Sequence, residues 1–479
     1  MRPIRTVASA ALLTVLAAVL AGCGGGGGDE SIPSYSVPHL KLSDLHPCRH
    51  VDHPTRMGCG NIKLPFERQD PSLGKTKIAF AVRPRDETGR PSEGAIFAVE
   101  GGPGYGSSRT AGSYRKLFGP LLKRRELVTV DMRGTGDSDA LDCPGLQRGS
   151  APDWIAFPNC ARKLGPRFGS YRTSAAADDI NDVRRALGYR KITLYGDSYG
   201  TFLSQSYAYR HPDTLNALVL DSAYPVQGES AWYPSIISTG VRSMSISCRR
   251  SPKCSGSATK RLAKLVHFLR DNNRGVGPLV DALGGAGYNP PATYLRIDRA
   301  GTDLRHGHSL PWKRLIAEAK LGHGHVEHYS AMDEEVVSCN DYPLLWPKDA
   351  SETQRRVDLE HAARTYRNPA LKPFSATDVG LSSSTLYQYC LAAPRPSSLY
   401  EPPVSPGEKP TTAPVLVVSG ELDNVTTPYE GTLTAKEFPD SRHYIAKGAG
   451  HVADLYTPRH SKAGMKTRHF LHHVYDHGG

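Results

Sequence analysis

Lys191-Ile-Thr-Leu-Tyr-Gly-Asp-Ser-Tyr-Gly200 places a serine, Ser198, between two glycines directly after a run that favours a β-strand. The run is rich in β-branched and aromatic side chains, as buried strands are. Residues 201–210 contain no Gly or Pro and lead to His211-Pro212, where a helix should stop. A strand, a sharp turn with serine at its apex and a helix form a nucleophile elbow, which needs glycine two residues either side of the serine. The stretch therefore predicts a reactive serine at the edge of an α/β sheet.

The Gly-x-Ser-x-Gly pattern alone is weak support for this prediction. The chain contains 47 glycines, so such a pattern can arise by chance. The alternative interpretation is an ordinary Gly-Ser surface turn. The strand-like run before the pattern and the helix-like run after it favour the elbow.

Short apolar runs recur along the chain and alternate with helix-like stretches, as is typical of an α/β sheet. Several are almost continuously apolar, as expected for parallel strands covered by helices on both faces. The runs are 77–82, 95–99, 127–130, 192–195, 215–220, 415–418 and 443–446. A helix is expected from Ser174 to Leu187, capped by Thr173 and ended by Gly188. We predict a mostly parallel central sheet with flanking helices.

Residues 228–405 differ in composition from the rest of the chain. They contain two cysteine pairs and basic helix-like stretches such as 260–270. We interpret this region as a mainly helical cap inserted into the sheet domain, whose two parts are then residues 45–227 and 406–479. The proline-rich end of the region leads back into a buried strand, which marks the return to the sheet.

The N-terminus has the features of an export signal. Two arginines precede the apolar stretch 8–21, which is too short for a comfortable membrane span. The stretch leads into Leu20-Ala-Gly-Cys23, which resembles the lipobox of bacterial lipoproteins. This implies a signal peptide over residues 1–22, lipid on Cys23 and a flexible, glycine-rich tether over 23–44. The alternative is an ordinary secretory signal. Either way we expect an exported protein, held on the outer side of the cell membrane by lipid or also released.

Cysteine usage fits an oxidising compartment. Setting Cys23 aside leaves eight cysteines, an even number that suits disulfides. Eight cysteines allow about 105 pairings, so the connectivity stays open. Short loops favour Cys48 with Cys59, Cys143 with Cys160 and Cys248 with Cys254, which leaves Cys339 and Cys390 for each other. Neither the cysteines nor the histidine-rich pieces have the ligand pattern of a zinc site, so we expect no metal and no cofactor.

The formal net charge of the chain is +12. A basic surface on an exported protein suits anionic envelope polymers or lipid headgroups, although a generally solvated basic surface is the simpler interpretation. We find no stacking or groove-binding module in the sequence and expect no nucleic-acid partner.

A serine nucleophile needs a general base, and that base needs an orienting carboxylate. The run 415–418 is followed by Ser-Gly-Glu421-Leu-Asp423, which places carboxylates just after a buried strand. After the last strand-like run comes Lys-Gly-Ala-Gly-His451, where glycines let the loop turn the imidazole inward. The order serine, acid, histidine is the order expected on this kind of sheet. We assign Asp423 as the orienting acid and His451 as the base, with Glu421 as the rival acid.

The oxyanion of an acyl-transfer intermediate needs two backbone N–H donors. One is the amide of Tyr199, directly after the nucleophile. The second is expected in the loop after the run 95–99, which reads Glu-Gly-Gly102-Pro-Gly-Tyr-Gly106, and we assign it to Gly102. A phosphate loop is the competing interpretation of these glycines, but no Gly-Lys-Ser/Thr follows.

Together these motifs resemble the prolyl iminopeptidase and tripeptidyl-aminopeptidase-like serine exopeptidases of the α/β-hydrolase superfamily. The segments that carry the resemblance are 101–104, 131–138, 196–200, 420–426 and 448–452, with Cys339-Asn-Asp341 and Cys390 in the cap and C-terminal part. The resemblance implies an α/β-hydrolase fold, the triad Ser198, Asp423 and His451, and cleavage from the amino end of a peptide.

An aminopeptidase must also bind a free α-ammonium group, which relatives do with carboxylates of the cap. The candidates are Glu334, Glu335 and Asp341, although acidic residues on a cap helix are most often merely solvated. Glu100 stands where many relatives carry His or a neutral residue and is a further candidate. Asn424 also departs from the family, because proline is common after the acid.

We therefore expect an exported serine hydrolase, an aminopeptidase that acts on short peptides through an acyl-serine intermediate. A carboxylesterase or lactone hydrolase is the alternative, because the same machinery cleaves esters and amides. A second alternative is a non-catalytic envelope-binding protein of the same fold. The oligomeric state and the side-chain preference stay open.

Overall fold

The computed structural model describes residues 35–49, 51, 56–151, 153–318, 324–380, 382, 386–455 and 461–477. The predicted signal peptide, Cys23 and the first part of the predicted tether lie outside these residues. None of the helices in the described part of the chain has the length and apolar character needed to cross a membrane.

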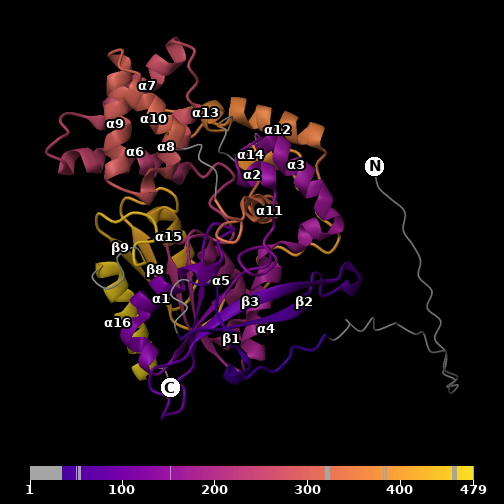
Figure 1. The fold of residues 1–479 in the computed structure, drawn as a ribbon. Coiled ribbons are helices and arrows are strands. Elements are labelled where there is room, and N and C mark those ends of the chain that lie inside the picture. Colours follow the sequence, from indigo (N-terminus) through magenta and orange to yellow (C-terminus); the bar gives the residue numbers. More distant parts are fainter. Residues whose placement is uncertain are drawn as a thin grey trace, which may run out of the picture.

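A nine-stranded sheet forms the centre of the molecule, with the strand order β1-β2-β3-β5-β4-β6-β7-β8-β9 (Figure 1). The strands are β1 (His46–Pro47), β2 (Gly58–Pro65), β3 (Lys75–Arg83), β4 (Ala95–Val99), β5 (Glu126–Val130), β6 (Ile192–Asp197), β7 (Leu215–Asp221), β8 (Val415–Gly420) and β9 (Ser441–Ala446). From β5 to β9 all neighbours pair in parallel, whereas β1, β2 and β3 are antiparallel additions at one edge. The predicted fold class is confirmed, and each predicted strand is present.

Two strands at the edge, β1 and β2, were not predicted. Strand β2 is partly exposed over its first half and becomes buried only towards Pro65. It also contains two glycines and lacks the continuous apolar run that marks the central strands. Its pairing with β3 is set by the fold rather than by a local pattern.

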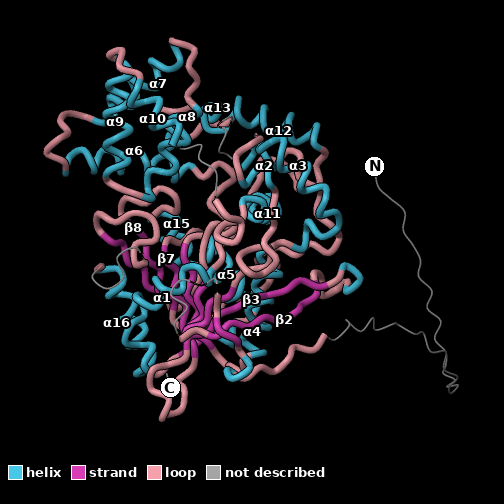
Figure 2. The backbone as a smooth tube through the Cα atoms, in the orientation of Figure 1, coloured by secondary structure: helices cyan, strands magenta, loops and turns pink. Residues whose placement is uncertain are grey.

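Helices cover both faces of the sheet (Figure 2). On one face, α4 (Thr173–Ala186) and α5 (Tyr199–Arg210) share an apolar cluster with alternate strand residues. On the other face, α1 (Ala111–Phe118) and α16 (Lys462–His477) share a second cluster. This arrangement explains why the central strands are apolar on both sides.

The predicted cap of the helix at 174–187 is wrong, although its end at Gly188 is confirmed by a positive φ of 75°. The helix includes Thr173, and the Thr173 side chain does not cap it. Instead, the amide and the hydroxyl of Thr173 both donate to Asp341, which lies far along the chain. A carboxylate at a helix N-terminus accepts a hydrogen bond from an amide that has no partner within the helix. Its negative charge also interacts favourably with the positive end of the helix dipole.

The segment between β7 and β8 is helical, as predicted for the cap (Figure 1). Its helices are α6 (Pro234–Arg250), α7 (Ala258–Asp271), α8 (Gly277–Gly284), α9 (Ala292–Arg305), α10 (Leu310–Glu318), α11 (Ala331–Asp341), α12 (Glu352–Thr365), α13 (Ala376–Gly380) and α14 (Leu386–Cys390). Two helices from before the elbow, α2 (Pro144–Gln147) and α3 (Asp153–Leu164), share the apolar core of this region. The cap is therefore built on a platform contributed by the first part of the sheet domain.

The three disulfides favoured by short loops, Cys48–Cys59, Cys143–Cys160 and Cys248–Cys254, are present, and so is the remaining pair, Cys339–Cys390. The first lies at the sheet edge, between β2 and the residues after β1. The last joins α11 to α14 inside the cap.

Replacing Cys339 and Cys390 by alanine is expected to lower the free energy of unfolding by about 4 kcal/mol, because the bridge spans 51 residues. Chemical denaturation followed by circular dichroism measures the loss. Removing Cys248–Cys254, with a separation of 6, is the matched control and should cost about 2 kcal/mol. Equal losses for the two bridges would contradict the loop-closure reasoning.

Candidate active site

Ser198 lies at the turn between β6 and α5, as the elbow motif predicts. Its backbone has φ +51° and ψ −123°, a strained conformation for a residue with a side chain. A Cβ on Gly196 would lie 2.2 Å from the carbonyl oxygen of Gly200, and a Cβ on Gly200 would lie 2.4 Å from that of Val99. The turn is therefore tight enough to require both glycines.

The three residues assigned to the triad lie in one hydrogen-bonded row. His451 Nε2 is 2.9 Å from Ser198 Oγ, and His451 Nδ1 is 3.0 Å from Asp423 Oδ2. Asp423 is fully buried and His451 is 3% exposed. When Nδ1–H donates to Asp423, Nε2 can accept the proton of Ser198. The arrangement can therefore turn the serine into a nucleophile and hold the imidazole in the required orientation.

The loop after β8 fixes the Asp423 carboxylate. Oδ1 accepts the backbone amides of Val425 and Thr426, at 2.9 and 3.1 Å. The Thr426 hydroxyl donates to Oδ2 at 3.1 Å and also lies 3.2 Å from His451 Nδ1. These hydrogen bonds hold the carboxylate in place with Oδ2 directed at the imidazole.

The rival acid, Glu421, lies away from His451 and is engaged by other groups. Its oxygens accept two hydrogen bonds from Arg250, at 2.7 and 2.9 Å, and one from the amide of Gly448 at 2.7 Å. The hydrogen bonds from Arg250 lower the pKa of Glu421. The structure thus places Asp423, and not Glu421, on the imidazole.

The histidine loop is held to the end of β7 by groups that the sequence did not indicate. The backbone amides of residues 452–454 donate to the Ser222 hydroxyl and to both oxygens of Asp221, at 2.7 to 3.2 Å. Burial, together with the nearby Asp454, raises the pKa of Asp221 well above its usual value. These bonds position His451 over Ser198. Asp221 lies some 230 residues from its partners along the chain, so no local sequence pattern could predict this contact.

The cap also contacts the catalytic loops directly. The backbone amide of His451 donates to the Gly287 carbonyl at 2.9 Å. The Tyr288 ring meets the imidazole edge-on, with ring centroids 5.0 Å apart and an interplanar angle of 83°. Tyr288 is 55% exposed, so it covers one side of the imidazole while facing solvent on the other. The segment after α8 therefore forms one wall of the site.

Asn424, which departs from the family pattern, links the acid loop to the cap. Its side-chain amide donates to the Leu283 carbonyl at 2.9 Å, and its oxygen accepts from the Tyr294 hydroxyl at 2.8 Å. Asn424 is fully buried. A proline at this position could make neither bond, so the asparagine brings the cap and the Asp423 loop into fixed contact.

The glycine-rich loop after β4 lies directly against the nucleophile. A Cβ on Gly101 would lie 2.6 Å from the Cβ of Ser198. Gly102 has φ +111°, a conformation that favours glycine. Tyr199 is the first residue of α5, so its amide has no acceptor within the helix. The amides of Gly102 and Tyr199 stay the predicted oxyanion donors.

Glu100 faces the residue that precedes the nucleophile. The Tyr114 hydroxyl is 2.8 Å from Asp197 Oδ1 and 3.2 Å from Glu100 Oε2. Burial, and then the Glu100 carboxyl, raise the pKa of Asp197 well above its usual value. Glu100, which is partly exposed, thus shares the Tyr114 hydroxyl with the buried Asp197 carboxyl at the elbow.

Asp341, one of the candidates for binding the substrate amine, is likewise engaged by the protein. It accepts from Thr173 at 2.6 Å and from the Tyr400 hydroxyl at 3.1 Å. It is 7% exposed, and burial raises its pKa while nearby Lys348 opposes the rise. These contacts make Asp341 a link between α11 and α4.

Glu334 and Glu335 on α11 are in a different situation. Every other residue of α11 is buried, but Glu334 is partly exposed and accepts a hydrogen bond from the Tyr329 hydroxyl. Burial, and then Asp153, raise the pKa of Glu334 to about 7. Glu335 has a buried carboxylate oxygen with no hydrogen-bond partner among the described residues. The same causes raise its pKa well above the usual value.

Tyr329 connects these carboxylates to the oxyanion loop. Its ring packs on that of Tyr105, with centroids 4.6 Å apart, and the two residues form an isolated antiparallel bridge. Gly104 lies against the Ser330 carbonyl, because a Cβ there would approach it to 2.5 Å. The N-terminal end of α11 thus rests on the loop that touches Ser198.

The described residues contain one close group of possible metal ligands, Cys248, Cys254 and Asp298. Cys248 and Cys254 are joined in a disulfide, and Asp298 is paired with Arg261 at 2.6 Å. A disulfide sulfur is not a thiolate ligand, so these residues do not fit a metal ion.

Comparison with known proteins supports the architecture. Residues 94–238 match the family described as alpha/beta hydrolase fold, and residues 378–473 match the family described as TAP-like protein. The two segments contain Ser198 in the first and Asp423 with His451 in the second.

Three curated relatives are similar over part of the chain. Tripeptidyl aminopeptidase of Streptomyces coelicolor is 29% identical over 204 residues, which is 38% of this chain and 37% of that protein. Serine protease Hip1 of Mycobacterium bovis is 26% identical over 306 residues, 57% of this chain and 56% of that protein. Proline iminopeptidase of Neisseria gonorrhoeae is 30% identical over 148 residues, 31% of this chain and 38% of that protein. The chain therefore spans about a third to somewhat over half the length of these relatives.

Proposed function

We propose that this chain, which belongs to the α/β-hydrolase superfamily and carries a TAP-like C-terminal segment, is a serine peptidase that acts on the amino ends of short peptides. The observation that carries the proposal is the buried row from Ser198 through His451 to Asp423, with spacings of 2.9 and 3.0 Å. The names of the three relatives support a peptidase over other hydrolases.

In the proposed reaction, Ser198 Oγ attacks the scissile carbonyl while His451 Nε2 takes its proton. The amides of Tyr199 and Gly102 donate to the oxyanion of the tetrahedral intermediate. His451 then gives the proton to the leaving amine, and the C–N bond breaks to leave an acyl ester on Ser198. Water, deprotonated by His451, attacks this ester, and the serine recovers its proton as the acid product leaves. Asp423 stabilises the imidazolium in both halves of the cycle.

The substrate amine is proposed to bind at Glu334, with Glu335 beside it. The pKa values of both carboxyls are raised by burial, and neither forms an ion pair with a basic side chain among the described residues. A substrate ammonium group would supply the missing positive charge in a partly buried setting, where an ion pair is stronger than in water. The proposal is supported by the contacts of Tyr329, whose hydroxyl donates to Glu334 and whose ring packs on Tyr105 of the oxyanion loop.

The protein is also proposed to be exported and attached through lipid on Cys23. The four disulfides fit an oxidising compartment. Mass spectrometry of the protein from membranes tests the anchor, since a lipidated cysteine at the mature N-terminus is expected and an unmodified one would reject it.

The amine requirement is tested with matched substrates. Aminoacyl and tripeptidyl p-nitroanilides with a free amine should be cleaved, whereas the same compounds with an acetylated amine should be cleaved at least about a hundredfold more slowly. Equal cleavage of free and blocked substrates would contradict the aminopeptidase and favour an esterase-like hydrolase. An absence of turnover on both anilides and acyl esters would contradict an enzyme altogether.

The pH dependence of kcat/KM should reflect the ionisation of Glu334, because burial raises the pKa of this carboxyl to about 7. The carboxylate form is required to bind the ammonium group, so kcat/KM for the free-amine anilide should rise through pH 7 more steeply than for p-nitrophenyl butyrate. The ratio of the two kcat/KM values removes the pH dependence of the catalytic steps that both substrates share. This ratio should rise up to about tenfold per pH unit below 7 and fall again above about 8, where the substrate amine loses its proton. A ratio that is flat between pH 5 and 8 would contradict the role of Glu334.

A further inference from the structure

Two carboxyl groups that the proposed reaction does not use lie behind the nucleophile. Glu100 directly precedes the glycines of the oxyanion loop, and Asp197 directly precedes Ser198. Strands β4 and β6 pair in parallel, with Val99 opposite Gly196. The residues that follow this pair, Glu100 and Asp197, therefore come at the same level of the sheet.

The two loops that begin at these residues pack backbone against backbone. A Cβ on Gly101 would lie 3.0 Å from the Asp197 carbonyl oxygen, and a Cβ on Gly200 would lie 3.1 Å from that of Glu100. The Glu100 amide also donates to the buried Ser107 hydroxyl at 3.0 Å. With contacts this close, a shift at Glu100 displaces the oxyanion loop relative to the nucleophile turn.

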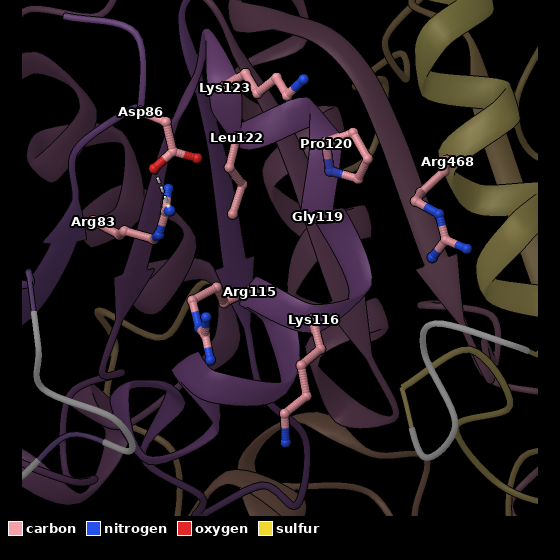
Figure 3. Close-up of a pocket in the computed structure, with 9 residues that line it drawn as sticks. All are labelled: Arg83, Asp86, Arg115, Lys116, Gly119, Pro120, Leu122, Lys123 and Arg468. Carbon is pink, nitrogen blue, oxygen red and sulfur yellow. Dashed lines mark hydrogen bonds and ion pairs between the residues drawn. The ribbon is translucent and has the colours of Figure 1, made fainter.

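The Tyr114 hydroxyl lies between the two carboxyl groups. It is 2.8 Å from Asp197 Oδ1 and 3.2 Å from Glu100 Oε2. Tyr114 belongs to α1 and is fully buried, whereas the next two residues of this helix, Arg115 and Lys116, are exposed and line a basic cavity (Figure 3). Helix α1 therefore directs the phenol into the protein, towards the elbow.

The hydrogen bonds of this group need one proton more than the phenol supplies. A phenol donates one hydrogen bond, and an ionised carboxylate only accepts. If both carboxyls were ionised, Tyr114 could donate to only one of them. Asp197 Oδ2, which is buried, has no hydrogen-bond partner among the described residues either. One proton on the carboxyl pair removes the deficit, because the protonated carboxyl can then donate to the phenol oxygen or to the other carboxyl.

Burial and neighbouring charge favour a proton on the pair. Asp197 is fully buried, and the pKa of its carboxyl is raised by burial first and by the Glu100 carboxyl second. Burial and both carboxyls raise the pKa of the Tyr114 phenol well above its usual value, so the phenol keeps its proton. Two carboxyls placed in this way do not both ionise. Among the described residues, the titratable groups that interact with Asp197 are carboxyls and phenols: Glu100, Tyr114, Tyr195, Asp221 and Asp454.

We propose that Glu100 is a positioning residue, which shares one proton with Asp197 and the phenol of α1 and thereby holds the oxyanion loop against the nucleophile turn. This role rests on the proposed acyl transfer at Ser198, and it holds for an ester as well as for a peptide substrate. Ser198 and the Tyr199 amide follow Asp197 by one and two residues. The second proposed oxyanion donor, the Gly102 amide, follows Glu100 by two. The carboxyl pair therefore sets the spacing between the nucleophile and both donors.

The test compares Glu100→Ala with Glu100→Gln in the full chain. Alanine removes the carboxyl, whereas glutamine keeps its size and can still donate a hydrogen bond in place of the protonated acid. Both kcat and KM are measured for a free-amine anilide and for p-nitrophenyl butyrate, together with the rate at which a fluorophosphonate probe labels Ser198. Glu360→Ala, which removes an exposed carboxylate from α12, is the matched control.

We expect Glu100→Ala to lower kcat for both substrates at least about tenfold, because a displaced oxyanion donor stabilises the transition state less. KM should change by less than about threefold, since binding of the ground state does not use these donors. Probe labelling should slow together with kcat. Glu100→Gln and Glu360→Ala should both keep kcat within about threefold of the wild-type value.

An unchanged kcat in Glu100→Ala, or equal losses in Glu100→Ala and Glu100→Gln, would overturn the positioning role. A loss confined to the free-amine anilide would overturn it as well and place Glu100 in the substrate-amine site. The ester and the probe carry no amine. A wild type that cleaves the ester but not the anilide would therefore reject the aminopeptidase while the ester and probe rates still decide the role of Glu100.

Tyr114→Phe is the second variant, which decides the matter if Glu100→Ala does not fold. It keeps the buried ring and removes only the hydroxyl between the two carboxyls. We expect a loss of kcat on both substrates with little change in KM, and an unchanged kcat would overturn the proposed link.

Discussion

Replacing Ser198 by alanine should lower kcat for a free-amine anilide by a factor on the order of 10⁴ to 10⁶, because the acyl-enzyme can no longer form. The remaining rate would come from the oxyanion donors and from binding alone. The effect is large because the row from Ser198 to Asp423 acts as a unit, in which His451 has no proton to accept once the hydroxyl is gone. Initial rates with purified variant and wild type give the factor directly.

The control for this variant is Ser204→Ala on the same helix, α5. Ser204 is fully buried and its hydroxyl has no hydrogen-bond partner among the described residues, so its removal should leave kcat within about twofold. Ser204→Ala removes no hydrogen bond among the described residues, and Ser198→Ala removes the one to His451, so both variants should unfold at temperatures within a few degrees of the wild type. Retention of more than about 1% of wild-type activity by Ser198→Ala would reject Ser198 as the nucleophile.

Replacing Glu334 by glutamine should lower kcat/KM for free-amine substrates by about a hundredfold or more, equal to roughly 3 kcal/mol of transition-state binding. Glutamine keeps the size of the side chain and can still accept from the Tyr329 hydroxyl, but it removes the charge that attracts the ammonium group. Hydrolysis of p-nitrophenyl butyrate, which has no amine, should change little. The ratio of the two substrates should also lose its rise through pH 7.

Stability provides an independent check on the Glu334 variant. Burial raises the pKa of Glu334 from 4.5 to about 7, so the folded state holds its proton more tightly than the unfolded state does. This group therefore favours folding fully below about pH 4.5 and loses that contribution as the pH rises to about 7. The uncharged glutamine should make the variant at least as stable as the wild type at pH 8.

The matched control is Glu360→Gln on α12, an exposed carboxylate of the same cap. It should leave both substrates unaffected. If Glu334→Gln lowers the anilide and the ester rates equally, or if Glu360→Gln behaves like it, the amine site is not at Glu334.

The catalytic triad could be predicted from sequence because each member stands in a local pattern. The turn at Ser198 needs glycine at 196 and 200 for steric reasons, and Asp423 and His451 lie in the loops that follow strand-like runs. Parallel strands end at the same edge of a sheet, so residues after several such strands are brought together even when far apart in the chain. The structure brings the three together at hydrogen-bond distance.

The supporting contacts could not be predicted, because their partners are remote in sequence. Asp221 holds the histidine loop from some 230 residues away, and Asp341 engages Thr173 across 168 residues. The sequence suggested that the Thr173 hydroxyl caps α4, but this hydroxyl and the Thr173 amide instead both donate to Asp341, a carboxylate from the cap region. Tertiary packing also decides which acidic residues of α11 are hydrogen-bonded to other protein groups and which can bind a substrate.

The strands at the edge of the sheet could not be predicted from sequence either. The central strands are buried on both faces and are visible as apolar runs, whereas β2 is half-exposed and has no such run.

Labelling with a fluorophosphonate probe, followed by peptide mass spectrometry, shows whether Ser198 is the nucleophile. We expect one modified residue, Ser198, with labelling that is strongly reduced in His451→Gln because the serine then lacks its base. Failure of wild-type protein to react, or modification of a different serine with Ser198 left free, would contradict it.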